Sequence, residues 1–153
     1  MGIDKLVKAE KLPYYEKLVD IREFMEDNSY TNFPLNCCQE TAKLNTFIIP
    51  SLEEVAGFYK VEDPVKYDDY KLGHAWNLDS KRGLYVDLTA DQFDLKNPKI
   101  MVFEIGNNPD YMENLNATYS QLDIYYDDSE FKENMDRLLN LYSKREIFLE
   151  KKY

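Results

Sequence analysis

Apolar residues recur at helical spacing in three parts of the chain. The first helix is predicted from residue 14 to about residue 27, with one apolar side formed by Leu18, Ile21, Phe24 and Met25. The second is predicted from residue 37 to residue 49, with Asn36 as its N-cap and Pro50 ending it. Its expected buried side consists of Leu44, Phe47 and Ile48. The third runs from residue 129 to about residue 151, and its apolar side contains Phe131, Met135, Leu138, Leu139, Tyr142 and Ile147.

Four further stretches are typical of β-strands and begin near residues 55, 73, 84 and 99. Gly57 lies inside the first of them and indicates a bulge. Residues 62–72 are rich in Asp, Tyr and Lys and are predicted to form a surface loop. Together these patterns predict one α+β domain over residues 1–153, with N-terminal helices and a C-terminal helix packed on an antiparallel sheet.

The two strands that begin near residues 73 and 84 form a predicted hairpin. With residues 79–82 as a four-residue loop, Leu78 faces Gly83 and His74 faces Asp87. Strand side chains alternate, so one face holds His74, Trp76, Tyr85 and Asp87. The other face, suited to a core, holds Ala75, Leu84, Val86 and Leu88. A loop one residue longer would separate Asp87 from His74.

The formal net charge of -10 argues against nucleic acid and anionic membranes as partners, because both would be repelled. No apolar run approaches the roughly 18 residues that a membrane-spanning helix needs. The first residues also lack the apolar core of a signal peptide. These features predict a cytoplasmic protein in which Cys37 and Cys38, being adjacent, are reduced thiols.

The cysteine pair, the single histidine and Asp87 are the parts of a thiol-nucleophile site. A thiol has an ordinary pKa of about 8.5 and is mostly protonated near neutral pH. A helix start and a nearby imidazolium both favour the thiolate. A carboxylate on the second ring nitrogen would then orient the imidazole. Either cysteine could supply the thiol on this argument.

Three segments resemble transglutaminase-like, papain-fold cysteine enzymes, and most closely the small bacterial and phage members. They are residues 33–44, His74-Ala75-Trp76, and residues 86–93 with the sequence Val-Asp-Leu-Thr-Ala-Asp-Gln-Phe. The resemblance covers residues 31 to 105, about half the chain. It implies a papain-like fold in which Cys38 is the nucleophile, His74 the general base and acid, and Asp87 the orienting residue.

The same resemblance implies further residues and a reaction. Trp76 would shield the site and Asn36 would contact substrate, while Asp91 and Gln92 would brace the loop after Asp87. Asn36 stands where family members tend to have glycine, and Ala42 where a small hydroxyl residue is common. The implied reaction is acyl transfer or hydrolysis at an amide of a protein or peptide, through a thioester. It would need no cofactor.

Two alternatives follow from the same residues. Trp76 is equally well explained as a core residue, and the whole chain as an acidic binding or inhibitory protein, possibly phage-derived, that acts on a basic protein. No metal site is predicted, because the acidic residues 127–130 precede a helix, where they interact with its dipole. Neither the acyl acceptor nor the oligomeric state follows from the sequence.

Overall fold

The computed structural model describes residues 6–29, 33–34, 37–60, 71–106, 111–113 and 128–152. Its helices are α1 (Tyr15–Asn28), α2 (Cys38–Ile48) and α3 (Asp128–Lys152), with short 3-10 helices η2 (Ala9–Lys11) and η3 (Ala90–Gln92). Its strands are β1 (Glu53–Lys60), β2 (Lys71–Asp79), β3 (Leu84–Asp87), β4 (Met101–Glu104) and β5 (Tyr111–Glu113). The predicted α+β class, with helices at both ends of the chain, is confirmed.

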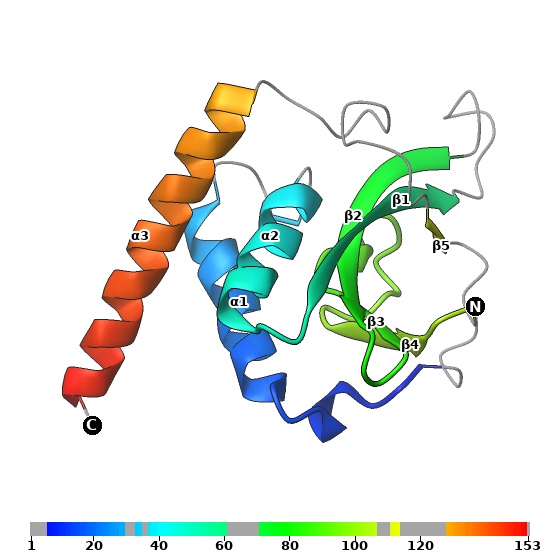
Figure 1. Ribbon diagram of the computed structural model, residues 1–153, viewed down its shortest axis with the longest axis horizontal. Helices are drawn as coiled ribbons and strands as arrows, with labels where there is room; N and C mark the ends of the chain where they lie inside the picture. Colours follow the sequence, from blue (N-terminus) through cyan, green and yellow to red (C-terminus); the bar gives the residue numbers. More distant parts are fainter. Residues whose placement is uncertain are drawn as a thin grey trace.

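The strands form one antiparallel sheet in the order β4-β3-β2-β1-β5. Figure 1 shows the curved sheet on one side of the molecule and the three helices on the other. Helix α2 contacts β1 and β2 as well as α1 and α3, so it lies at the centre of the fold (Figure 1). The start of α2 is therefore held directly against the middle of the sheet.

Both faces of the sheet are buried. One large core lies under the helices and joins Leu18, Ile21 and Phe24 of α1 to Leu84, Val86 and Leu88. A second core on the other face contains Val55, Tyr59, Trp76, Tyr85, Ala90, Met101 and Phe103. The predicted division of the hairpin side chains between two faces is therefore confirmed. Every residue of β3 is buried as a result.

The helix boundaries are close to those predicted, but α2 differs from the prediction in its N-cap and in the burial of Phe47. Cys37 occupies the N-cap position without a capping side-chain hydrogen bond, and the helix begins at Cys38. Asn36, the expected N-cap, lies outside the described residues. Leu44 is buried as predicted, but Phe47 is 57% exposed, so its assignment to the core was wrong. Lys43 lies over the Phe47 ring, its Nζ 6.0 Å from the ring centroid.

The hairpin loop is shifted by one residue from the prediction. Leu78 pairs with Tyr85 and Asp79 with Leu84, which leaves residues 80–83 as the loop. Asp79 stays in the strand because its buried carboxylate accepts hydrogen bonds from Tyr14 (2.6 Å) and Arg82 (3.0 Å). Gly83 ends the loop with a positive φ of 66°. Glycine adopts this conformation readily because it has no Cβ.

The sheet corrects two further expectations. Gly57 pairs regularly with His74 and with Glu113, so the predicted bulge is absent from this ladder. The short strand β5 comes from a part of the sequence whose weak periodicity gave no prediction. The predicted surface loop falls mostly on residues 61–70, which lie outside the described residues.

Candidate active site

His74 and Asp87 form a buried hydrogen-bonded pair. Nε2 of His74 lies 2.6 Å from Oδ2 of Asp87, and the two side chains are 0% and 1% exposed. Extending the observed register places Asp87 beside Trp76, so His74 lies one same-face position further along β2. Diagonal neighbours of this kind are within reach of long side chains. The expectation that His74 directly faces Asp87 is therefore wrong, but the two residues still meet.

The two cysteines at the start of α2 have different surroundings. Cys37 belongs to the core under the helices, together with Leu44. Cys38 instead packs with Ala42 and with Ala75, the neighbour of His74 on β2. Cys38 is also near enough to the His74 imidazole to contribute to raising the His74 pKa. Of the two thiols, Cys38 is thus the one brought to His74 and Asp87.

The environment of His74 favours its protonated form. Burial by itself lowers the pKa of His74, but the Asp87 carboxylate and Cys38 raise it to about 9. An ionised carboxylate only accepts hydrogen bonds, so Nε2 is the ring atom that donates to Asp87. Nδ1 is then the nitrogen available to the Cys38 thiol. This arrangement suits an imidazolium held between the Cys38 sulfur and the Asp87 carboxylate.

The second oxygen of Asp87 is held by the segment that follows β3. Oδ1 of Asp87 accepts hydrogen bonds from the Thr89 backbone N–H (2.8 Å) and the Thr89 hydroxyl (3.2 Å). Gln92 in turn donates to the Thr89 hydroxyl at 3.2 Å. Aspartate binding a backbone N–H two residues later is a compact local turn. It fixes the direction in which the Asp87 carboxylate points.

Aromatic rings enclose the imidazole. Trp76 stacks on His74 with ring centroids 5.5 Å apart, and Phe93 meets it edge-on at 4.7 Å. Tyr59 stacks on Phe93 at 4.1 Å and lies edge-on to His74 at 6.3 Å. Trp76 is only 1% exposed, so in this structure it packs on the histidine and belongs to the core as well.

A buried amide network ties α2 to β2. Asn45 donates to the side-chain oxygen of Asn77 at 2.8 Å. Asn77 donates to the backbone carbonyl of Ala42 at 3.0 Å, and to that of Glu53 at 3.3 Å. Asn77 is on the same strand as His74, and Ala42 is one turn after Cys38. The network therefore fixes how the helix start sits relative to the histidine.

None of the protein-family models, curated proteins or solved structures compared with this chain matches it.

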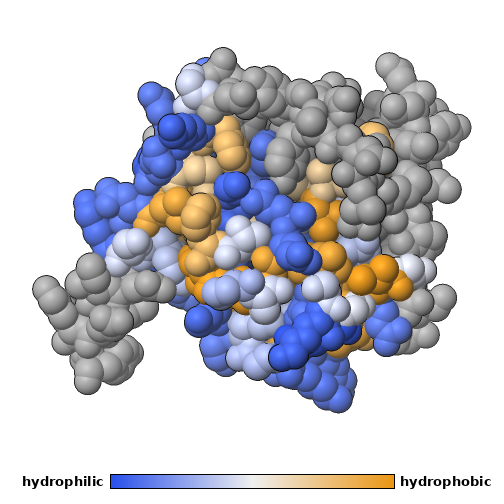
Figure 2. Space-filling view, in the orientation of Figure 1, coloured by the Kyte–Doolittle hydropathy of each residue, from blue (hydrophilic) through white to orange (hydrophobic). Residues whose placement is uncertain are grey.

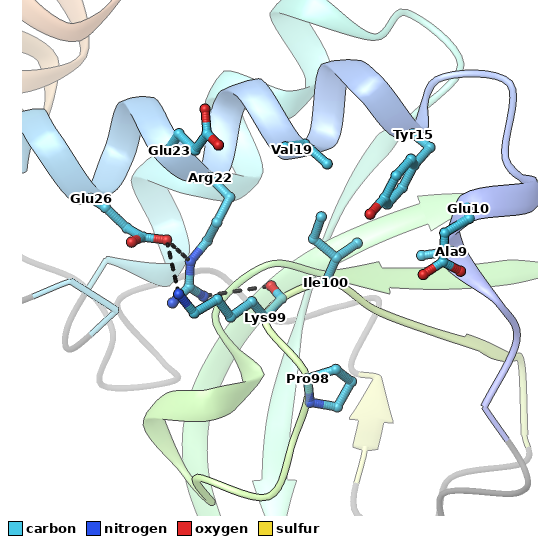
Figure 3. A pocket seen from close by; sticks show the side chains of 10 residues that line it. All are labelled: Ala9, Glu10, Tyr15, Val19, Arg22, Glu23, Glu26, Pro98, Lys99 and Ile100. Carbon is cyan, nitrogen blue, oxygen red and sulfur yellow. Dashed lines mark hydrogen bonds and ion pairs between the residues drawn. The ribbon is translucent and has the colours of Figure 1, made fainter.

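A groove of about 450 Å³ lies between α1, η2 and residues 98–100. Figure 3 shows the side chains that line it. Its apolar lining includes Tyr15, Val19 and Ile100, and its acidic lining consists of Glu10, Glu23 and Glu26. Neither Cys38, His74 nor Asp87 lines it. The groove and the Cys38–His74–Asp87 cluster are separate features of the molecule.

Two absences hold for the part of the chain that the structure describes. Within those ranges, no cluster of three or more His, Cys, Asp or Glu side chains could hold a metal ion. Likewise, no helix there has both the length and the apolar character needed to cross a membrane.

Several residues around the site were missed by the sequence argument. Thr89, Asn45 and Asn77 carry no pattern that distinguishes them before the fold is known. Arg22 does carry one, because it lies four residues after Leu18 and three before Met25, within the buried side of α1. A lone cation on the apolar side of a helix indicates a buried anionic partner, and Asp91 is that partner.

Proposed function

We propose that this protein is a cysteine acyltransferase or hydrolase acting at amide bonds, with a transglutaminase-like, papain-like fold. Cys38 is the nucleophile, His74 the general acid and base, and Asp87 the residue that orients the imidazole. The observation that carries the proposal is the buried His74–Asp87 hydrogen bond of 2.6 Å beside the Cys38 thiol at a helix start.

The reaction we propose begins with the Cys38 thiolate and the His74 imidazolium. The sulfur attacks the carbonyl carbon of an amide and forms a C–S bond. Backbone N–H groups at the start of α2 stabilise the negative oxygen that develops. His74 gives its proton to the leaving nitrogen as the C–N bond breaks, which leaves a thioester on Cys38.

The second half of the reaction regenerates the enzyme. Water or an amine attacks the thioester, His74 accepts the proton of that nucleophile, and the thiolate leaves. Asp87 stabilises the imidazolium in both halves without itself being protonated. With water the result is hydrolysis or deamidation, and with an amine it is transfer of the acyl group.

The first experiment measures iodoacetamide labelling of each cysteine against pH by mass spectrometry. Cys38 is only 7% exposed, so the informative quantity is its labelling rate at pH 6 divided by its rate at pH 9. This ratio cancels the effect of burial on access. Cys37, which is also buried with 4% of its surface exposed, is the internal control.

We expect a high ratio for Cys38 that is lost in His74→Ala, and a low ratio for Cys37 in both proteins. Labelling of both cysteines that rises only near pH 8.5 and ignores His74 would refute a His-activated thiolate. That result would favour the alternative of an acidic binding protein. The formal net charge of -10 would then be the reason to test binding to a basic protein.

A further inference from the structure

Arg22 is a buried cation that links α1 to the segment after Asp87. Its side chain is 5% exposed, and its guanidinium carbon lies 4.6 Å from the centroid of the Phe33 ring. Burial alone lowers the pKa of Arg22, but hydrogen bonds to Asp91 and Glu26 raise it above its ordinary value. The Arg22 side chain therefore stays positively charged, and its contacts with Asp91, Glu26 and the Phe33 ring hold it in one position.

The guanidinium binds the loop between β3 and β4 at two adjacent places. Its Nη1 and Nη2 each donate to one oxygen of Asp91 at 2.8 Å, a bidentate ion pair. Nη1 also donates to the backbone carbonyl of Leu88 at 2.7 Å. Leu88 is the residue directly after Asp87, and Asp91 lies in η3. One side chain thus fixes both ends of the short segment that follows the carboxylate.

Nε of Arg22 and one longer contact of Nη1 face the groove. Figure 3 shows Arg22 reaching from α1 towards Lys99, with its bonds to Glu26 and to the Lys99 backbone carbonyl. Nε lies 2.9 Å from Glu26, and Nη1 lies 3.5 Å from the Lys99 oxygen. The Glu26 side chain is 36% exposed, so this contact is on the solvent side. Glu26 and Asp91 therefore offer two contacts of the same arginine that can be removed separately.

We propose that Arg22 is a positioning residue for the His74–Asp87 pair, acting through Leu88 and Asp91. The inference rests on the proposed function, because it concerns how that site is kept ready. A buried ion pair is weak evidence for stability, since desolvation offsets its attraction. A bidentate pair does fix geometry, however. Asp87 accepts from the Thr89 N–H within this clamped segment, so movement of the segment moves the carboxylate.

The test uses Asp91→Asn and Arg22→Lys, each of which removes the bidentate geometry while nearly conserving side-chain size. Glu26→Gln is the matched control, because it removes the negative charge of the solvent-side partner of Arg22 and leaves Leu88 and Asp91 in place. His74 is the only histidine in the chain, so histidine-labelled protein gives a single imidazole signal by NMR. The readouts are the His74 pKa, the Cys38 labelling ratio defined above and the urea midpoint.

We expect Asp91→Asn and Arg22→Lys to lower the His74 pKa and to reduce the Cys38 labelling ratio by about 10-fold, the change in thiolate fraction that one pKa unit produces. Glu26→Gln should leave both at wild-type values. If Asp91→Asn does not fold, Arg22→Lys carries the test. Variants with a lowered urea midpoint but a wild-type His74 pKa and labelling ratio would overturn the inference and leave the proposed function standing. An ordinary His74 pKa in the wild type would overturn the proposed function itself, and this inference with it.

Discussion

Glu40 is a carboxylate buried in the first turn of α2, with only 4% of its surface exposed. Burial raises the pKa of Glu40 from 4.5 to about 7, although a backbone hydrogen bond at Glu40 partly opposes this. The folded protein therefore binds a proton here more tightly than the unfolded chain does. Stability is lost as the pH rises from about 4.5 through about 7, and the whole cost is present above that range.

The magnitude follows from the two pKa values. The difference between 4.5 and about 7 corresponds to about 3 kcal/mol at pH 8. Glu40→Gln keeps the size of the side chain and removes its charge, so it should stabilise the protein by up to about 3 kcal/mol at pH 8. For a domain of this length, that is a rise in Tm of about 6 to 12 °C. At pH 4.5 the gain should nearly vanish.

The assay is thermal and urea unfolding of wild type and Glu40→Gln at pH 4.5, 6 and 8. Glu16→Gln is the control, because Glu16 is an exposed acid in the first turn of α1 and has the same relation to a helix dipole. Equal stabilisation by Glu40→Gln at all three pH values would refute the reasoning. So would a Glu40→Gln protein that is less stable than wild type at pH 8.

Three further predictions follow from the same structure. Asp87→Asn removes the carboxylate that raises the His74 pKa and leaves the burial that lowers it, so this pKa should fall from about 9 to below 6.5 in an NMR titration. A His74 pKa that stays near 9 in the variant would mean that Asp87 does not raise it. In the wild type this pair stabilises the fold below pH 6.5, and that contribution is lost as the pH rises through about 9. Asn77→Leu should cost about 2 kcal/mol in urea unfolding, because it leaves the Asn45 amide and a carbonyl contact unsatisfied; a neutral effect would mean that the network does not hold α2. Gly83→Ala should cost about 1 kcal/mol, since its φ is positive while an added Cβ meets no atom within 4 Å; Gly83→Asn should cost less.

The sequence predicts those parts of the fold in which apolar residues recur with a regular period. Leu18, Ile21, Phe24 and Met25 predict α1 because burial of one helical side requires this spacing. The same holds for the alternation that places His74 and Asp87 on one face. Alternation has a period of two, however, so it cannot distinguish a register from one shifted by two residues. The observed shift is of that kind.

The parts that could not be predicted depend on tertiary contacts. The predicted loop begins at Asp79, whereas a hydrogen bond from Tyr14, a distant residue in the chain, holds Asp79 in the strand. Phe47 fits the apolar side of α2, but the fold leaves its side chain exposed while Asn45 and Ile49 on either side are buried. Figure 2 shows that hydrophobic residues on this face lie in patches interrupted by hydrophilic ones. Phe47, Leu95 and Ile105 are the exposed large hydrophobic residues of the described chain.

The antiparallel connection of β2 and β3 also has a consequence for folding kinetics. His74 and Asp87 are close in sequence and belong to one hairpin, and hairpins form within about 1–10 μs. Cys38 reaches the pair only when α2 is packed on β2, a contact of greater sequence separation that costs more loop-closure entropy. The His74–Asp87 pair therefore needs only the hairpin, whereas the placement of Cys38 beside it needs the packed fold.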